Sequence, residues 1–93
     1  MNTKKLAKVY KALSNENRLG IFKEILKQER KEYKDGCFIN DILEKFKIGA
    51  PTVSHHLKEL ANANLISTKK EGKYLVVSIN KEILEEIKNE FDF

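Results

Sequence analysis

The spacing of apolar residues along this chain changes at Leu65. Before Leu65 they recur every three or four residues, which is the spacing of one face of an α-helix. After it, residues 65–70 and 73–79 alternate apolar and polar side chains, as half-buried β-strands do. Glu71-Gly72 lies between these segments and favours a two-residue type I′ hairpin turn. The chain is therefore predicted to be mainly α-helical with a small β-hairpin near its end.

Four helices are predicted before the hairpin and one after it. Thr3 is the predicted N-cap of the first, Ser14 of the second, Asn40 of the third and Asn80 of the last. Pro51 lies in the first turn of the fourth helix, where its missing N–H costs nothing. A tight turn joins the third and fourth helices, so the order α-α-α-α-β-β-α is that of a winged helix-turn-helix.

The second helix is expected to carry most of the core. Its predicted buried stripe is Leu19, Phe22, Ile25 and Leu26, with Ile21 on the flank. A polar segment follows, and residues 38–39 are predicted to be briefly extended before the third helix begins.

The length and composition favour one small intracellular domain. Ninety-three residues, 41% of them apolar, form a single predicted domain over 1–93 that gains stability by sharing apolar surface with a second copy. Cys37 is the one cysteine, so no disulfide closes within the chain, as expected in a reducing cytosol. No apolar run is long enough to span a bilayer, and an amphipathic pattern instead of a signal core follows the first residues. We expect a cytoplasmic protein with no membrane partner.

Charge is distributed unevenly along the chain. Residues 1–79 hold 16 Lys and Arg against 9 Asp and Glu, a balance of +7, whereas residues 80–93 hold 2 against 5, a balance of −3. A basic body with an acidic last helix favours a polyanionic partner that the last helix does not face. The alternative is a lysine-rich solvated surface without a binding role.

The fourth helix has two chemically different faces. At about 100° per residue its apolar side chains point to the core, and these are Val53, Leu57 and Leu60. The polar side chains then point outward, and these are Thr52, Ser54, His55 and Lys58. Hydroxyls and a helix N-terminus suit phosphate oxygens, while imidazole and hydroxyl groups reach base edges in a major groove. An ordinary solvated face is the alternative, but the position between a tight turn and a hairpin favours DNA.

Two further groups of basic residues have alternative interpretations. Neighbouring positions on a helix point about 100° apart, so His55 and His56 are not a chelating pair; His56 is interpreted as a hydrogen-bonded residue at the edge of the core, or else as a phosphate contact. The hairpin lysines are expected to lie along a phosphate backbone or, alternatively, to protect a sheet edge from aggregation. They are Lys69, Lys70 and Lys73.

Three segments resemble the ArsR/SmtB-type repressors. KALSNENRLGIFKEIL (11–26) resembles their opening, NDILEKFKIGAPTVSHHLKELANANLI (40–66) their helix-turn-helix core, and KKEGKYLVVSIN (69–80) their wing. The resemblance implies a homodimeric repressor that binds a near-palindromic operator, with half-sites about 34–36 Å apart. On the family's plan Thr52, Ser54 and His55 contact bases and phosphates, with the wing lysines on flanking phosphates. The full predicted DNA-binding set is Pro51, Thr52, Ser54, His55, His56, Lys58, Lys69, Lys70 and Lys73. The resemblance also implies a dimer interface on the first and last helices, where apolar residues exceed the needs of a small core: Leu6, Val9, Tyr10, Ile83, Leu84, Ile87 and Phe91.

The chain departs from this family at its sensory motifs. Gly49-Ala50 stand where Ser-Gln is usual, so fewer bases are expected to be read directly. Phe38 and Asn40 occupy the cysteine positions of the Cys-x-Cys metal pattern. The last helix has no histidine, and its carboxylates are hard ligands that select transition metals poorly. We therefore predict no metal site and no cofactor, with Cys37 as a candidate redox residue.

The favoured function is thus a transcriptional repressor that needs no metal. One alternative is a winged-helix module that binds a protein, and another is a thiol-responsive repressor that acts through Cys37. An enzyme is not predicted, because the sequence has no nucleophile–base arrangement and no glycine-rich phosphate loop.

Overall fold

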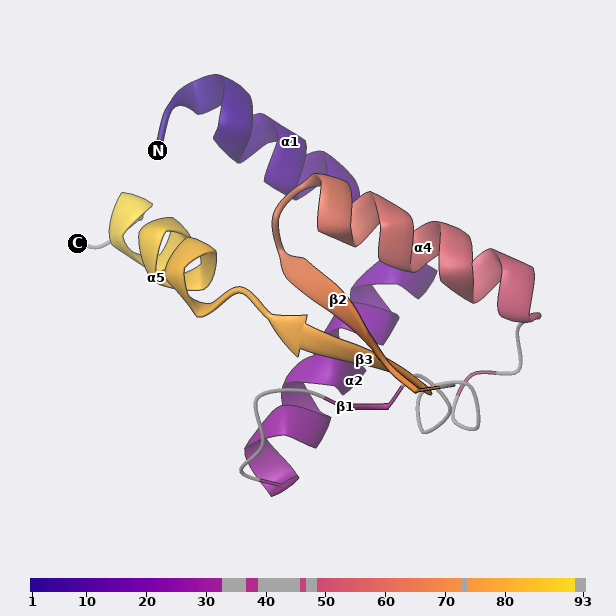
Figure 1. Ribbon diagram of the computed structural model, residues 1–93. Helices are drawn as coiled ribbons and strands as arrows, with labels where there is room; N and C mark the ends of the chain where they lie inside the picture. Colours follow the sequence, from indigo (N-terminus) through magenta and orange to yellow (C-terminus); the bar gives the residue numbers. More distant parts are fainter. Residues whose placement is uncertain (33–36, 39–45, 47–48, 73, 92–93) are drawn as a thin grey trace.

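The computed structural model describes residues 1–32, 37–38, 46, 49–72 and 74–91. Its elements are α1 (Thr3–Leu13), α2 (Glu16–Glu32), β1 (Cys37–Phe38), α4 (Ala50–Asn62), β2 (Ile66–Glu71), β3 (Tyr74–Ile79) and α5 (Lys81–Glu90) (Figure 1). Four of the five predicted helices and the hairpin are confirmed. The remaining helix, expected after Asn40, lies outside the described residues. None of the described helices is long and apolar enough to cross a membrane.

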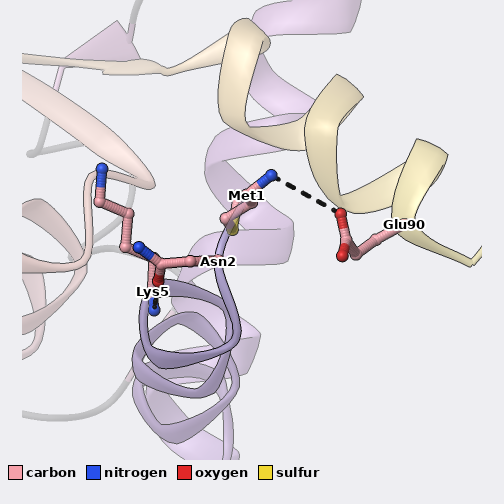
Figure 2. Close-up of polar contacts among 4 residues, drawn as sticks. All are labelled: Met1, Asn2, Lys5 and Glu90. Carbon is pink, nitrogen blue, oxygen red and sulfur yellow. Dashed lines mark hydrogen bonds and ion pairs between the residues drawn. The ribbon is translucent and has the colours of Figure 1, made fainter.

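The N-cap of helix α1 lies one residue earlier than predicted. The N-cap is Asn2, not Thr3, and its Oδ1 accepts a hydrogen bond of 2.8 Å from the backbone N–H of Lys5 (Figure 2). Asn caps a helix at least as well as Thr, so the adjacent amide takes the role. The terminal ammonium of Met1 lies 3.8 Å from Glu90 Oε2, which links the start of α1 to the end of α5.

The boundary between α1 and α2 is also displaced by one residue. Ser14, the predicted N-cap of α2, instead ends α1, with its hydroxyl donating to the carbonyl oxygen of Lys11 at 2.7 Å. Asn15 caps α2, since its Oδ1 accepts from the backbone N–H of Arg18 at 3.0 Å. The prediction for α5 is confirmed, because Asn80 Oδ1 accepts from the N–H of Ile83 at 3.4 Å.

The three strands form an antiparallel sheet in the order β1-β3-β2. The brief extended segment was predicted at 38–39 and is found at Cys37–Phe38, where it pairs with β3. Glu71, predicted in the turn, instead belongs to β2 and pairs with Tyr74, so the hairpin turn begins at Gly72, one residue later than predicted. The shift gives the positive φ of 62° to Gly72, which has no Cβ to clash, and leaves Glu71 extended.

The core lies where α1, α2, α4 and the sheet meet. Ile21, predicted on the flank of α2, is completely buried, whereas Leu19, predicted in the buried stripe, is 39% exposed. Helix α2 contacts α1, α4 and β3 at once, so the surrounding elements and not its own periodicity determine which residues are buried.

Val9 was wrongly predicted at a dimer interface. Its side chain is 1% exposed in the single chain because it packs in the core, so no partner surface can reach it. The other six interface candidates keep accessible surface: Leu6, Tyr10, Ile83, Leu84, Ile87 and Phe91.

Candidate nucleic-acid interface

The first turn of α4 is exposed to solvent. Gly49 is the N-cap, with extended backbone and no side chain to cap the helix, and Pro51 lies in the first turn. The Gly49 carbonyl accepts from the N–H groups of Thr52 and Val53, each at 3.1 Å. The helix therefore begins at the predicted place, with its first turn at the surface.

The outer face of α4 carries the polar side chains that the periodicity placed there. All of the following are exposed: Pro51, Thr52, Ser54, His55 and Lys58. The inner face is buried and consists of Val53, His56, Leu57 and Leu60. The helix thus presents hydroxyl, imidazole and ammonium groups to a ligand while three aliphatic side chains hold it to the core. Contact of these groups with DNA stays a prediction.

His56 does not belong to the exposed set, although we predicted it as a DNA-binding residue. It is 6% exposed, and its Nδ1 lies 3.5 Å from Nη1 of Arg18 on α2. Burial lowers the pKa of His56 below its ordinary value of 6.5, and the positive charges of Arg18 and of His55 lower it further. An imidazole this deeply buried is not placed to contact phosphate, so the burial of His56 agrees with the favoured interpretation of a hydrogen-bonded residue at the edge of the core and not with its place in the DNA-binding set.

The hairpin forms a wing with an exposed outer strand. Strand β2 is at the edge of the sheet, and Lys69 and Lys70 are exposed on it. Lys73 lies outside the described residues. In Figure 1 the tip of the wing and the N-terminal end of α4 point toward the same end of the molecule, whereas α5 and the N-terminus lie at the other end. A polyanion at the first end would meet the basic strand and the polar helix face together.

Polar contacts fix the base of the wing relative to α4. Asn80 Nδ2 donates to the carbonyl of Asn64 at 2.9 Å, and the Asn80 N–H donates to the carbonyl of Leu65 at 3.0 Å. Glu29, a buried residue of α2, accepts from the N–H of Ile79 through both carboxylate oxygens, each at 3.3 Å. These contacts join α2, the end of α4 and the wing.

Sequence reasoning missed both Arg18 and Glu29 as residues that orient the interface. Arg18 follows a capping residue and Glu29 lies in a polar stretch, so each fits an exposed helical position. Their partners, His56 and Ile79, are 38 and 50 positions away. No local spacing in the sequence links residues that far apart. Such partners can be identified only once the fold shows which charged side chains are buried, because a buried charge needs a partner.

No three His, Cys, Asp or Glu side chains come together to hold a metal in the part of the chain that the structure describes. His55 and His56 have ring centroids 5.9 Å apart and tilted by 49°, on different faces of α4. Cys37 is in β1, with its backbone paired to Val77.

Comparison with known proteins identifies related sequences along the whole chain. A family model described as a helix-turn-helix domain matches residues 13–68. The chain is 35% identical to an arsenical resistance operon repressor of Staphylococcus xylosus over 92 residues. The matched region covers 99% of this chain and 82% of that protein. It is 36% identical over 87 residues to an arsenical resistance operon repressor of Staphylococcus aureus, covering 94% and 77%.

Solved structures match the arrangement of the elements. An ArsR-like transcriptional regulator from Rhodococcus sp. RHA1 has a TM-score of 0.74 at 21% identity, over 94% of this chain and 76% of that one. A homodimeric winged helix-turn-helix DNA-binding domain from Mycobacterium bovis has a TM-score of 0.72 at 21% identity, over 92% and 74%. At these identities the likeness concerns the fold, and the predicted winged helix-turn-helix is confirmed.

Proposed function

Because this chain belongs to the ArsR/SmtB-type family of winged helix-turn-helix regulators, we propose that it is a transcriptional repressor that binds double-stranded DNA as a homodimer. The observation that carries this proposal is the exposed polar face of α4 beside a lysine-bearing wing. Thr52, Ser54 and His55 are exposed over a buried apolar face, and Lys69 and Lys70 are exposed on β2.

Each part of this surface has a distinct role in the proposal. Helix α4 enters the major groove, where His55 and the hydroxyls of Thr52 and Ser54 meet base edges and phosphates. Lys58, on the same face, meets a flanking phosphate. The wing lysines lie along the neighbouring backbone and contribute affinity that does not depend on sequence.

The dimer is proposed to form through α1 and α5. Tyr10 is 44% exposed and Phe91 55% exposed, with ring centroids 6.0 Å apart in an edge-to-face arrangement. Helix α5 has no fully buried residue in the single chain: Ile83, Leu84 and Ile87 share one face of it and are only partly buried against the core. A second copy would cover these apolar groups. A two-fold axis there would present two α4 helices to a near-palindromic operator.

We further propose that repression needs no transition metal and that the protein acts in the cytoplasm as a binding protein, not an enzyme. The related staphylococcal proteins are named for arsenical resistance. This chain, however, has a single cysteine and no histidine in its last helix, so it lacks the thiolate pair and the histidine–carboxylate set of the family's metal sensors.

Selection of bound duplexes from a random library tests the proposal, followed by titration of the selected sequence against salt. We expect one near-palindromic site and a steep linear fall of log affinity with log salt. A protein-binding module would select no sequence and show no such slope. Repeating the titration with arsenite, zinc, a chelator and an oxidant tests metal independence and Cys37 together, and we expect equal affinity in all arms.

A further inference from the structure

A buried polar contact joins α2 to the inner face of α4. His56 is the one polar residue among the four buried side chains of Ala50–Asn62, and its Nδ1 faces Nη1 of Arg18 at 3.5 Å. The next residue toward the N-terminus, His55, is exposed on the outer face. The contact therefore lies directly behind a side chain proposed to meet DNA.

Arg18 is itself fixed by two other elements. Its Nε donates to the carbonyl oxygen of Ala12 in the last turn of α1, and its backbone N–H donates to the capping Asn15. One guanidinium thus connects the end of α1, the start of α2 and the middle of α4. Because its position is determined on two sides, it gives α4 a fixed reference point.

The contact with Arg18 determines which nitrogen of the His56 ring carries the proton. A guanidinium only donates, so Nδ1 must accept and carry no proton, which leaves the proton on Nε2. Among the residues that the structure describes, the charged and titratable groups that act on His56 are Arg18 of α2 and His55 of α4 itself. Arg18 is cationic, so a protonated His56 would place a second positive charge 3.5 Å from its Nη1, where Nδ1 no longer accepts.

We propose that Arg18 and His56 are positioning residues that fix the rotation of α4 about its axis, and so the aim of His55 and Ser54 into the major groove. Apolar packing is non-directional, so Val53, Leu57 and Leu60 hold α4 to the core without fixing its rotation closely. A hydrogen bond has a preferred direction and adds this constraint. The inference rests on the proposed operator binding.

Two variants of His56 separate positioning from packing. His56→Asn keeps an acceptor oxygen near the place of Nδ1 but cannot be protonated, whereas His56→Leu removes the acceptor. At neutral pH we expect His56→Leu to bind the operator about tenfold more weakly than wild type, with little change on random duplex. We expect His56→Asn to bind nearly as wild type. All variants are compared by circular dichroism at a temperature where each is folded.

The pH profile supplies a second readout. As the pH falls through the lowered pKa of His56, the operator affinity of wild type should fall relative to that of His56→Asn, because only wild type loses the acceptor by protonation. Both proteins keep His55, so the comparison isolates the change at position 56. In ¹⁵N spectra of the imidazole we expect the proton on Nε2 in wild type, and a His56 pKa closer to its ordinary value in Arg18→Met.

The proposal is overturned if His56→Leu binds the operator as tightly as wild type, if the ratio to His56→Asn does not change as the pH passes through the His56 pKa found in the ¹⁵N spectra, or if Nδ1 carries the proton at neutral pH. Absence of any duplex binding by wild type would instead contradict the proposed function. Amide hydrogen exchange then decides the positioning role without DNA: faster exchange along α4 in His56→Leu than in His56→Asn supports it, and equal exchange overturns it.

Discussion

His55 and His56 are neighbours in sequence and have opposite environments. One helical step of about 100° carries the side chain from the exposed face of α4 to the buried face. We expect His55→Ala to weaken operator binding by about 1–3 kcal/mol and to relax discrimination at one position of each half-site. Binding of wild type and variant to the selected operator and to its single-base changes measures this. The exposed Lys8→Ala on α1 is the control, and an equal loss on random duplex would contradict a base-reading role.

The same contrast shows which residue properties could be predicted from sequence. The outward set on α4 follows from helical periodicity alone, and it was predicted correctly. Val9 was assigned to an interface because apolar residues of one stripe look alike in sequence, although Val9 is in the core and Tyr10 is at the surface. The partners of Arg18 and Glu29 depend on how distant elements pack, which no local pattern contains.

Among the elements, the wing depends on one backbone conformation. Gly72 has φ of 62° at the hairpin turn, where a Cβ is strained even though space is open around it. We expect Gly72→Ala to destabilise the fold by about 1–2 kcal/mol and Gly72→Asn by less, since Asn tolerates this region better. Urea unfolding of the three proteins measures the difference. Equal stability of the Ala and Asn variants would show that the turn does not require a left-handed residue.

The wing also separates two roles of its lysines. Lys69 and Lys70 are exposed on an edge strand, where they could bind phosphate or discourage strand pairing between molecules. If Lys70 binds phosphate, Lys70→Ala weakens binding to operator and random duplex alike and lowers the slope of log affinity against log salt by about one unit. Lys88→Ala, on the surface of α5, is the matched control. An unchanged slope together with increased aggregation would favour edge protection.

Element boundaries were predicted less well than element types, and the reason is specific to this chain. Capping candidates occur side by side at Asn2-Thr3 and Ser14-Asn15, so the choice depends on how each helix enters the core. The hairpin turn is displaced by one residue because pairing of Glu71 with Tyr74 sets the register. The expected third helix lies outside the described residues.

At the scale of the whole molecule, the apolar face of α5 and the surface formed by α4 and the wing are suited to different partners. Ile83, Leu84 and Ile87 share a face of α5 and are only partly buried in the single chain, and α5 itself lies away from the wing tip (Figure 1). We expect Ile87→Asp to dissociate the proposed dimer, because burying an unpaired carboxylate at an apolar interface costs several kcal/mol. Light scattering and sedimentation at several concentrations measure the mass. Asn89→Asp adds the same charge at an exposed position of the same helix, and it should remain dimeric.

Dimerisation and operator binding are then coupled. Comparing how a monomeric variant binds the full operator and a single half-site tests this coupling. A two-fold dimer binds both half-sites at once, so a folded Ile87→Asp monomer should lose most of its operator affinity while its affinity for a single half-site changes little. Circular dichroism confirms that the monomer is folded. A variant that is monomeric yet binds the full operator as tightly as wild type would show that one chain suffices. A variant that stays dimeric would place the interface away from this face of α5.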